Sequence, residues 1–177
     1  MSQRYSGYER KERDLYETPE WVTLALVPHI LDLIPSKLIY EPAAGSGKMV
    51  SALVKGGFGV RSDDLSEGRD FLSCWHLNYP DEAIVTNPPY ELATEFIDRA
   101  LALTASNGVV AMLLRTDFDH AKSRKGMFGE CSVFAKKLVL TKRIKWFEDS
   151  KGQPSFNHAW FIWDWKHQGA PTLAYAT

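Results

Sequence analysis

Asn87-Pro88-Pro89-Tyr90 is the stretch whose residue types are best suited to chemistry, because it joins an amide, a stiff turn and an aromatic ring. It follows Ala83 to Thr86, an apolar run that predicts a short buried strand. Prolines fix their own φ angle and cannot donate to a strand ladder, so the chain must leave the sheet here. The Asn87 side-chain oxygen and the Pro88 carbonyl oxygen are two acceptors in one rigid turn. Such a pair can orient both N–H groups of a conjugated amine, and Tyr90 can stack on a planar base.

A glycine-containing loop lies upstream of this turn. Lys37 to Glu41 predicts a short strand, Pro42 to Lys48 a turn, and Met49 to Lys55 a helix. This is the βα unit in which backbone N–H groups at the helix start face a ligand. A phosphate-binding P-loop is excluded, because Pro42 and Met49 stand where that motif requires Gly and Ser or Thr. The three-glycine dinucleotide pattern is incomplete as well.

Two acidic residues, Asp63 and Asp64, follow the next predicted strand, Phe58 to Ser62. A carboxylate at the tip of the second strand can accept hydrogen bonds from both hydroxyls of a ribose, and either residue is a candidate. A solvated turn is the alternative interpretation. Gly68 to Leu72 then predicts a short third edge strand or a turn.

These candidate residues need a scaffold that brings the strand ends together. We expect further strands at 109–114, 138–147 and 159–165, helices at 19–33, 92–101 and 127–137, a polar loop at 115–125 and a long connection at 148–158. Thr18 should cap the first helix and Pro28 should kink or break it. The alternation of elements predicts an α/β, doubly wound fold with helices on both faces of about seven strands. Its sheet is mostly parallel and ends in an antiparallel pair. The tryptophans Trp160, Trp163 and Trp165 favour core and edge packing.

Length and composition predict one domain, residues 15–177, preceded by a flexible leader, residues 1–14. The formal net charge of −1 gives no global attraction to polyanions, so a nucleic-acid partner needs a local basic patch. Cys74 and Cys131 have no metal-ligand spacing with each other or with the histidines, so we expect no metal. Without a signal peptide or an apolar run long enough to span a membrane, we expect a cytoplasmic or nucleoid-associated protein with no membrane partner.

Five motifs follow one another along the chain. They are Tyr16-x-Thr18-Pro19, Glu41-Pro-Ala-x-Gly-x-Gly47, the acidic strand tip at Asp64, Asp70-Phe71-Leu72 and Asn87-Pro-Pro-Tyr90. Together they resemble the S-adenosylmethionine-dependent amino-methyltransferases, and most of all the DNA adenine N6-methyltransferases. The resemblance covers Tyr16 to about Trp165. It implies a Rossmann-like class I methyltransferase fold, S-adenosyl-L-methionine as the cofactor, and DNA as the partner.

The resemblance also implies roles for single residues. Tyr16, Thr18 and Pro19 hold the methionine end of the cofactor, and Asp64, rather than Asp63, binds the ribose. Asp70 accepts from the cofactor's adenine amino group, while Phe71 packs beside that ring. The loop under the amino-acid moiety is formed by Glu41, Pro42, Ala43, Gly45 and Gly47. The implied catalytic residues are Asn87, which also touches the cofactor, Pro88, Pro89 and Tyr90.

Substrate contacts are harder to assign from the sequence. Besides Tyr90, the candidates are His120, Lys122, Arg124 and Lys125 for phosphates, and Phe156 and His158 for closing over a flipped base. A solvated basic loop and a loop aromatic packed into the core are the respective alternatives.

Few residues follow the last predicted strand, so we expect no target-recognition domain. Low sequence preference, a separate specificity subunit, or a substrate other than duplex DNA are the possible consequences. Methylation of a protein glutamine amide or of an RNA base amine is the alternative function, and a catalytically silent cofactor-binding protein is a third. The compact form also resembles the enzymes of phages and mobile elements.

Overall fold

The structure, a computed structural model, describes residues 16–73, 83–146 and 156–176. The expected leader, residues 1–14, therefore lies outside the described residues, as does most of the expected connection at 148–158. The strands are β1 (Leu38–Glu41), β2 (Gly59–Ser62), β3 (Ala83–Thr86), β4 (Val109–Arg115), β5 (Phe134–Leu140), β6 (His158–Asp164) and β7 (Thr172–Ala176). The helices are α1 (Glu20–Ile30), α2 (Lys48–Lys55) and α3 (Ala93–Leu103), with short 3₁₀ turns η1 (Leu65–Glu67), η2 (Tyr90–Leu92), η3 (Phe118–His120) and η4 (Lys122–Met127).

All seven strands form one sheet in the order β2-β1-β3-β4-β6-β5-β7. Four neighbouring pairs are parallel, and only β6 runs antiparallel to both of its neighbours, β4 and β5. The chain passes from β1 outward to β2 and then returns to β3 on the other side of β1. The carboxyl ends of β1 and β3 therefore flank a topological switch point, the place where ligands bind in open α/β sheets.

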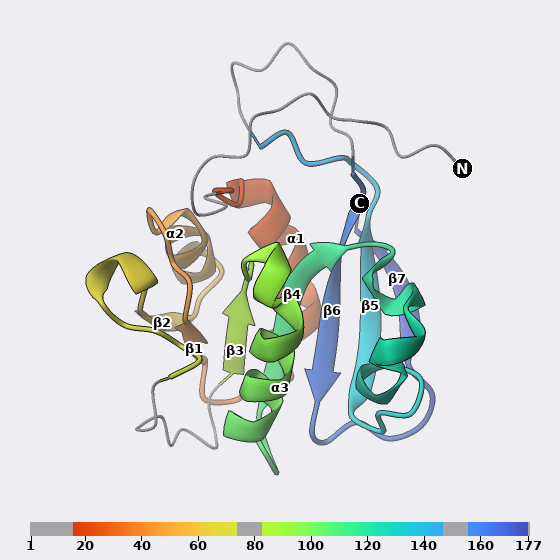
Figure 1. Cartoon of the computed structure of the whole chain (residues 1–177). Helices are drawn as coiled ribbons and strands as arrows, with labels where there is room; N and C mark the ends of the chain where they lie inside the picture. Colours follow the sequence, from red (N-terminus) through yellow and green to blue (C-terminus); the bar gives the residue numbers. More distant parts are fainter. Residues whose placement is uncertain (1–15, 74–82, 147–155, 177) are drawn as a thin grey trace.

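Helices cover both faces of the sheet, as expected (Figure 1). The core on one face unites α1 and α2 with residues such as Ile39, Val85 and Leu113. The core on the other face unites α3 with the alternate residues of the same strands, such as Ile84 and Met112. Period-two alternation thus supplies two apolar faces, and for this reason a central strand such as β3 is buried along its whole length.

The tryptophans of β6 illustrate this alternation. Trp160 and Trp163 are both fully buried, but they belong to opposite faces of the sheet. Trp160 donates its indole N–H to the Val22 carbonyl oxygen of α1 at 2.9 Å, and Trp163 donates to Met127 at 2.8 Å. The expected packing role of these two residues is confirmed.

Several local expectations were wrong. The helix expected at 127–137 is absent, because β5 begins at Phe134 and pairs with β6; the strand expected at 138–147 accordingly ends at Leu140. Pairing with the buried strand β6 determines the secondary structure of these residues, and the local spacing of apolar residues does not. Residues 68–72 form a turn, which is one of the two alternatives expected there. The strand β7, which pairs with β5 at the sheet edge, was not expected.

Helix α1 also differs in detail from the expectation. Pro19 is its N-cap, without any side-chain cap bond, so Thr18 does not cap the helix. The helix ends at Ile30, and Pro28 lies inside it without breaking it. Pro28 has no N–H, so the carbonyl of Leu24, four residues earlier, loses its helical hydrogen bond. Leu24 is 36% exposed, so water can replace that bond.

Candidate functional site

The Asn87 amide lies at the tip of β3 in a fixed orientation. Its nitrogen Nδ2 donates to the main-chain oxygen of Tyr16 at 3.1 Å. Its oxygen Oδ1 is buried and has no hydrogen-bond partner among the described residues. A carbonyl oxygen can only accept, so Tyr16 sets which end of the amide faces it. Because buried polar atoms are rarely left unpaired, this oxygen is an acceptor still available at the tip of β3.

Tyr90 is held by its hydroxyl group, which lies 2.9 Å from Nε2 of His158. His158 is the first residue of β6 and is only 2% exposed. Burial, with the nearby Arg115 charge, lowers the pKa of His158 to about 4, so the imidazole is neutral near pH 7. The Tyr90 ring lies 5.8 Å from the ring of Tyr16. His158 therefore anchors Tyr90 from within the fold and does not lie in an exposed loop.

Glu41 and Thr86 join the two strands of the switch point. Oε1 of Glu41 accepts from the Thr86 hydroxyl at 2.6 Å and from the Ala43 N–H at 3.0 Å. Its other oxygen, Oε2, is buried and has no partner among the described residues. Burial is the main cause that raises the pKa of Glu41 to about 8; the hydrogen bonds from Thr86 and Ala43 oppose it, and the charge of Asp64 adds to it.

The glycine loop between β1 and α2 depends on left-handed backbone at two positions. Gly45 has a φ of 52° and Gly47, the N-cap of α2, has a φ of 81°. Residues with a Cβ adopt these angles at a cost, which explains the glycines. A Cβ built at either position meets no atom within 4 Å, so the loop borders open space. A ligand can therefore approach the backbone of this loop closely.

Asp63 and Asp64 have different surroundings. Asp63 is 9% exposed and accepts from the Tyr40 hydroxyl at 3.0 Å and from the Arg69 guanidinium, so it serves the fold. Asp64 accepts from the Gly45 N–H at 2.9 Å and from both donors of Ser66. Burial works against ionisation of Asp64, but the hydrogen bonds from Ser66 and Gly45 prevail and lower its pKa. Asp64 is the partly exposed carboxylate beside the glycine loop.

Asp70 and Phe71 lie in the turn after η1. The carboxylate of Asp70 accepts from the Leu72 N–H at 3.0 Å and from the Ser73 hydroxyl at 2.9 Å. Phe71 is 3% exposed and packs 4.9 Å from the ring of Phe96 in the core below α3. Phe71 is thus a core residue next to Asp70, and its contact with a cofactor ring stays a prediction.

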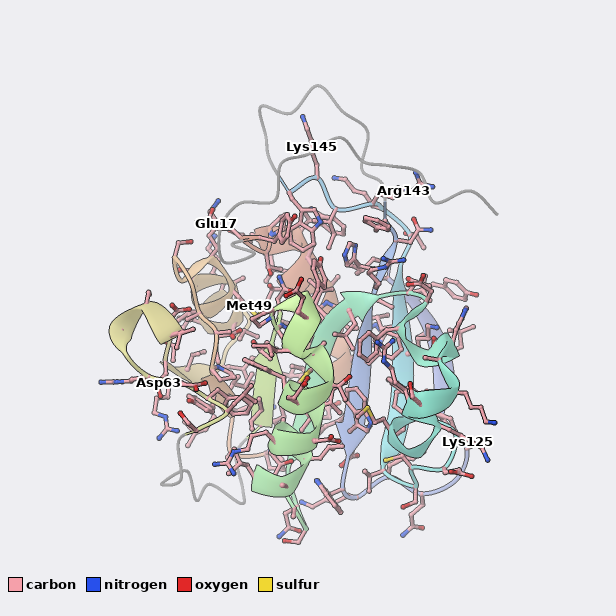
Figure 2. All side chains as sticks on the ribbon, viewed as in Figure 1. Glu17, Met49, Asp63, Lys125, Arg143 and Lys145 are labelled. Atoms are coloured by element: carbon pink, nitrogen blue, oxygen red, sulfur yellow. The ribbon has the colours of Figure 1, made fainter. Side chains whose placement is uncertain are left out.

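Residues 16–19 cross the top of the sheet and are tied on two sides. The carbonyl of Tyr16 binds Asn87, and the carboxylate of Glu17 pairs with Lys48, the first residue of α2, at 2.6 Å. Thr18, within this strap, is 5% exposed. Glu17 lies beyond the strand tips, above Met49 in the view (Figure 2). The strap therefore borders both the glycine loop and the Asn-Pro-Pro-Tyr turn.

The expected phosphate-contacting residues differ in their surroundings. Arg124 donates to the Phe118 carbonyl at 2.8 Å and lies over the Phe118 ring, and Lys125 pairs with Glu130. His120 lies 3.5 Å from Asp119, and Lys122 is exposed. Lys125 lies on the flank of the molecule, away from the strand tips (Figure 2). The charges of Arg124 and Lys125 are thus engaged within the loop.

Two further aromatic residues lie near the site. Phe156 is 41% exposed, with the Arg115 guanidinium 4.2 Å from its ring centre. Trp146, which sequence reasoning missed, lies 5.4 Å from the ring of Tyr16 and 5.2 Å from the His158 ring. No motif surrounds Trp146; the clue in the sequence was its position directly after three cations in the run Lys142 to Trp146.

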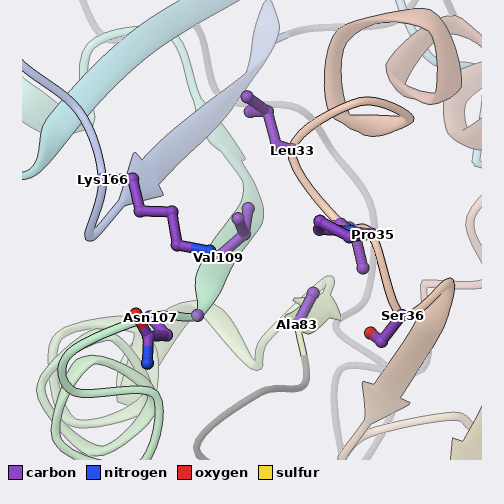
Figure 3. A pocket seen from close by; sticks show the side chains of 9 residues that line it. Leu33, Pro35, Ser36, Ala83, Asn107, Val109 and Lys166 are labelled. Atoms are coloured by element: carbon purple, nitrogen blue, oxygen red, sulfur yellow. The ribbon is translucent and has the colours of Figure 1, made fainter.

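A cavity of about 210 Å³ lies at the opposite edge of the sheet. It is bordered by the first residues of β3 and β4, Ala83 and Val109, and by Leu33, Ser36 and Lys166 (Figure 3). It contains none of the candidate catalytic residues. Within the described ranges no group of three metal-ligating side chains occurs, and no helix there is long and apolar enough to cross a membrane.

No protein-family model matches the chain, and no curated protein matches it in sequence. Solved structures do match its shape. A proposed class I S-adenosylmethionine-dependent methyltransferase of Listeria monocytogenes aligns with a TM-score of 0.62 at 14% identity, over 91% of this chain and 66% of that chain. A proposed RNA methyltransferase of Pyrococcus horikoshii gives 0.61 at 15% identity, over 91% and 90%. The fold is that of a class I methyltransferase.

The M protein of the type I restriction enzyme EcoKI shares this methyltransferase fold, with a TM-score of 0.56 at 12% identity. The alignment covers 84% of this chain and 44% of that protein. The chain thus spans less than half of the EcoKI M protein and 66% of the Listeria protein. Identities this low show the methyltransferase fold and leave the substrate to be argued from the site.

Proposed function

We propose that this protein transfers a methyl group from S-adenosyl-L-methionine to the exocyclic N6 amine of adenine in DNA. The observation that carries the proposal is the buried Oδ1 atom of Asn87, an acceptor without a partner in a turn at the switch point. An exocyclic amine supplies the N–H donor that this oxygen lacks.

The residues around the glycine loop fit the cofactor. Oε2 of Glu41 is suited to accept from the ammonium group of its amino-acid end, whose positive charge would favour the ionised carboxylate over the protonated form that burial otherwise favours. The open face of Gly45 and Gly47 admits that end to the backbone. Asp64 would accept the ribose hydroxyls, with Asp63 already bound to Tyr40 and Arg69. The methionine end of the cofactor would be held by Tyr16, Thr18 and Pro19. Its adenine amino group would donate to Asp70. When bound, the cofactor supplies an electrophilic methyl group.

The chemistry asked of the protein is positioning. The lone pair of an amine on a purine is delocalised into the ring, which makes the amine a weak nucleophile. Asn87 Oδ1 and the Pro88 carbonyl would each accept one N–H and turn the lone pair out of the ring plane. Because both acceptors are fixed before the substrate arrives, little reorganisation is needed in the transition state. Tyr90, anchored through His158, would stack on the base.

DNA is proposed as the substrate because the Asn-Pro-Pro-Tyr turn and the order of the motifs resemble the adenine N6-methyltransferases. A separate specificity subunit is proposed as a further partner, because the EcoKI M protein, which shares this fold, is one protein of a type I restriction enzyme.

The test is transfer of labelled methyl to pools of DNA, RNA and protein in parallel, with the intact chain and with Asn87→Ala. We expect label in N6-methyladenine of the DNA pool, and about 10²–10³-fold slower labelling with the variant. Asn107→Ala, an exposed asparagine at the opposite edge, is the matched control and should transfer normally. Label confined to protein or to RNA would overturn the proposed substrate, and equal transfer by Asn87→Ala would overturn the mechanism.

A further inference from the structure

The segment that follows β5, residues 141–146, emerges at the same sheet edge as Asn87. β5 and β4 both run antiparallel to β6, so they share one direction and their carboxyl ends lie on one side. Arg143 and Lys145 accordingly lie beyond the strand tips, at the end of the molecule where Glu17 is found (Figure 2). We refer to residues 141–146 as the β5 extension.

The β5 extension is a cationic segment with one buried side chain. It contains Lys142, Arg143 and Lys145 and no acidic residue, and all three cations are exposed. Ile144 between them is 1% exposed and belongs to the core below α1. Lys142 Nζ lies 5.0 Å from the Trp21 ring centre, and Arg143 donates from Nε to Asn157 at 2.9 Å. The buried isoleucine thus anchors a chain that directs its positive charges outward.

The extension ends in an aromatic ring that reaches the site. Trp146 contacts Tyr16, and Tyr16 contacts Tyr90, with ring centres 5.4 Å and 5.8 Å apart. A continuous series of rings therefore connects the Asn-Pro-Pro-Tyr turn to the cations. Positive charge along a groove together with aromatic stacking faces is how proteins bind single nucleic-acid strands without sequence readout.

We propose that the β5 extension is the polynucleotide-binding element of this protein. Lys142, Arg143 and Lys145 contact consecutive phosphates of one strand, and Trp146 stacks on a base beside the one that enters the site. This inference rests on the proposed function and adds to it the surface that supplies affinity. It also moves the phosphate contacts away from η4, because Lys125 lies on the flank of the molecule, whereas Arg143 and Lys145 lie beyond the strand tips (Figure 2).

The experiment measures binding of a fluorescent single-stranded DNA oligonucleotide over a series of NaCl concentrations. The variants are the triple change Lys142→Gln, Arg143→Gln, Lys145→Gln and the charge-matched triple change Lys122→Gln, Arg124→Gln, Lys125→Gln in η4. Each single-strand phosphate contact adds about 0.7 to the magnitude of the negative slope of log K against log salt. The extension triple should therefore make this slope less steep by about 2. A slope lost in the η4 triple and kept in the extension triple overturns the proposal.

Trp146 is tested by two substitutions in the same assay. Trp146→Ala should weaken oligonucleotide binding by about tenfold, and Trp146→Phe should restore most of it, because stacking needs a ring face. Melting temperature and cofactor binding by calorimetry verify that each variant is folded. Equal affinity for poly-glutamate and the oligonucleotide, or undetectable oligonucleotide binding by the intact chain at low salt, overturns the nucleic-acid assignment.

Failure of this inference can be told from failure of the proposed function. Normal methylation of DNA by the extension triple would contradict the assignment of the β5 extension as the DNA-binding element and would leave the proposed methyltransferase function unchanged. If the oligonucleotide binds through the extension in a salt-dependent way but label is found only in protein, the proposed DNA substrate is wrong and the assignment of the β5 extension holds.

Discussion

Asn87 donates its side-chain N–H to the main-chain oxygen of Tyr16, a residue 71 positions earlier in the chain. The bond fixes the amide, because turning it over would place two oxygens against each other. The candidate acceptor is therefore aimed by a backbone atom, which no substitution of the Tyr16 side chain removes. The Tyr16 side chain has a separate task, since its ring lies between those of Tyr90 and Trp146.

Asn87→Ala should abolish most methyl transfer while the cofactor still binds. The substitution removes one of two fixed acceptors, and losing such a group costs about 10²–10³ in kcat. Single-turnover transfer and calorimetry of cofactor binding separate the two effects. A dissociation constant that rises as steeply as kcat falls would place Asn87 in cofactor binding alone.

Asp63 and Asp64 should respond differently to alanine. Asp64→Ala is expected to weaken cofactor binding by at least about tenfold, because one charge-assisted hydrogen bond contributes about 1.5–3 kcal/mol. Asp63→Ala is expected to lower the melting temperature more, since it leaves the buried Tyr40 hydroxyl without its acceptor. Calorimetry and thermal melts on both variants check this. An unchanged cofactor affinity in Asp64→Ala would assign the ribose contact to another residue.

The pKa of Glu41 predicts a loss of stability with rising pH. Its folded pKa of about 8 is higher than the ordinary 4.5, so between these values the folded chain holds a proton that the unfolded chain releases. The free energy of unfolding therefore falls as pH rises through this window, by up to about 1.4 kcal/mol per unit. His158, with a folded pKa of about 4 against 6.5, acts in the opposite sense below pH 6.5.

Urea titrations at pH 6.5 and pH 8 isolate the contribution of Glu41. Glu41→Gln should remove most of the fall between these values, and Glu67→Gln, an exposed carboxylate of η1, should leave it in place. The same fall in the intact chain and in Glu41→Gln would mean that another group carries the proton.

Tyr90→Phe and Tyr90→Ala separate the anchor from the stacking face. The phenylalanine variant loses the hydroxyl that bonds buried His158, at a cost of about 1–3 kcal/mol in unfolding free energy, and should keep substrate affinity. The alanine variant should also raise KM by about tenfold, because the stacking ring is gone. Denaturation midpoints and steady-state kinetics on one DNA substrate test the pair; a KM equal in both variants would show that the ring does not stack.

The fold class was predictable because strand-forming apolar runs such as 83–86 and 109–114 are buried on both faces, and few alternatives exist for them. The antiparallel pairing of β5 with β6 was predictable too, but the start of β5 at Phe134 and the whole of β7 were not. Phe134 becomes a strand residue by contact with β6, and β7 is a mostly exposed edge strand with weak patterning. The Asn-Pro-Pro-Tyr turn was located from its prolines. Its bond to Tyr16 was not, since no local pattern reports a contact made by a backbone carbonyl so far away.

The contrast between Asp63 and Asp64 shows the same limit within the site. Two adjacent carboxylates at a strand tip look alike in the sequence, and only the positions of Tyr40, Arg69 and Gly45 distinguish them. Trp146 is the clearest omission, because its contact with Tyr16 joins two segments that have no relation along the chain.

The hydrogen bond between Glu41 and Thr86 crosses the switch point and ties β1 to β3 at their tips. Residues 16–19 add two further ties at this edge, from the Tyr16 carbonyl to Asn87 and from the Glu17 carboxylate to Lys48. Three contacts made by segments far apart in the sequence thus hold the Asn-Pro-Pro-Tyr turn and the start of α2 at a set separation, so loosening any one of them should disturb both.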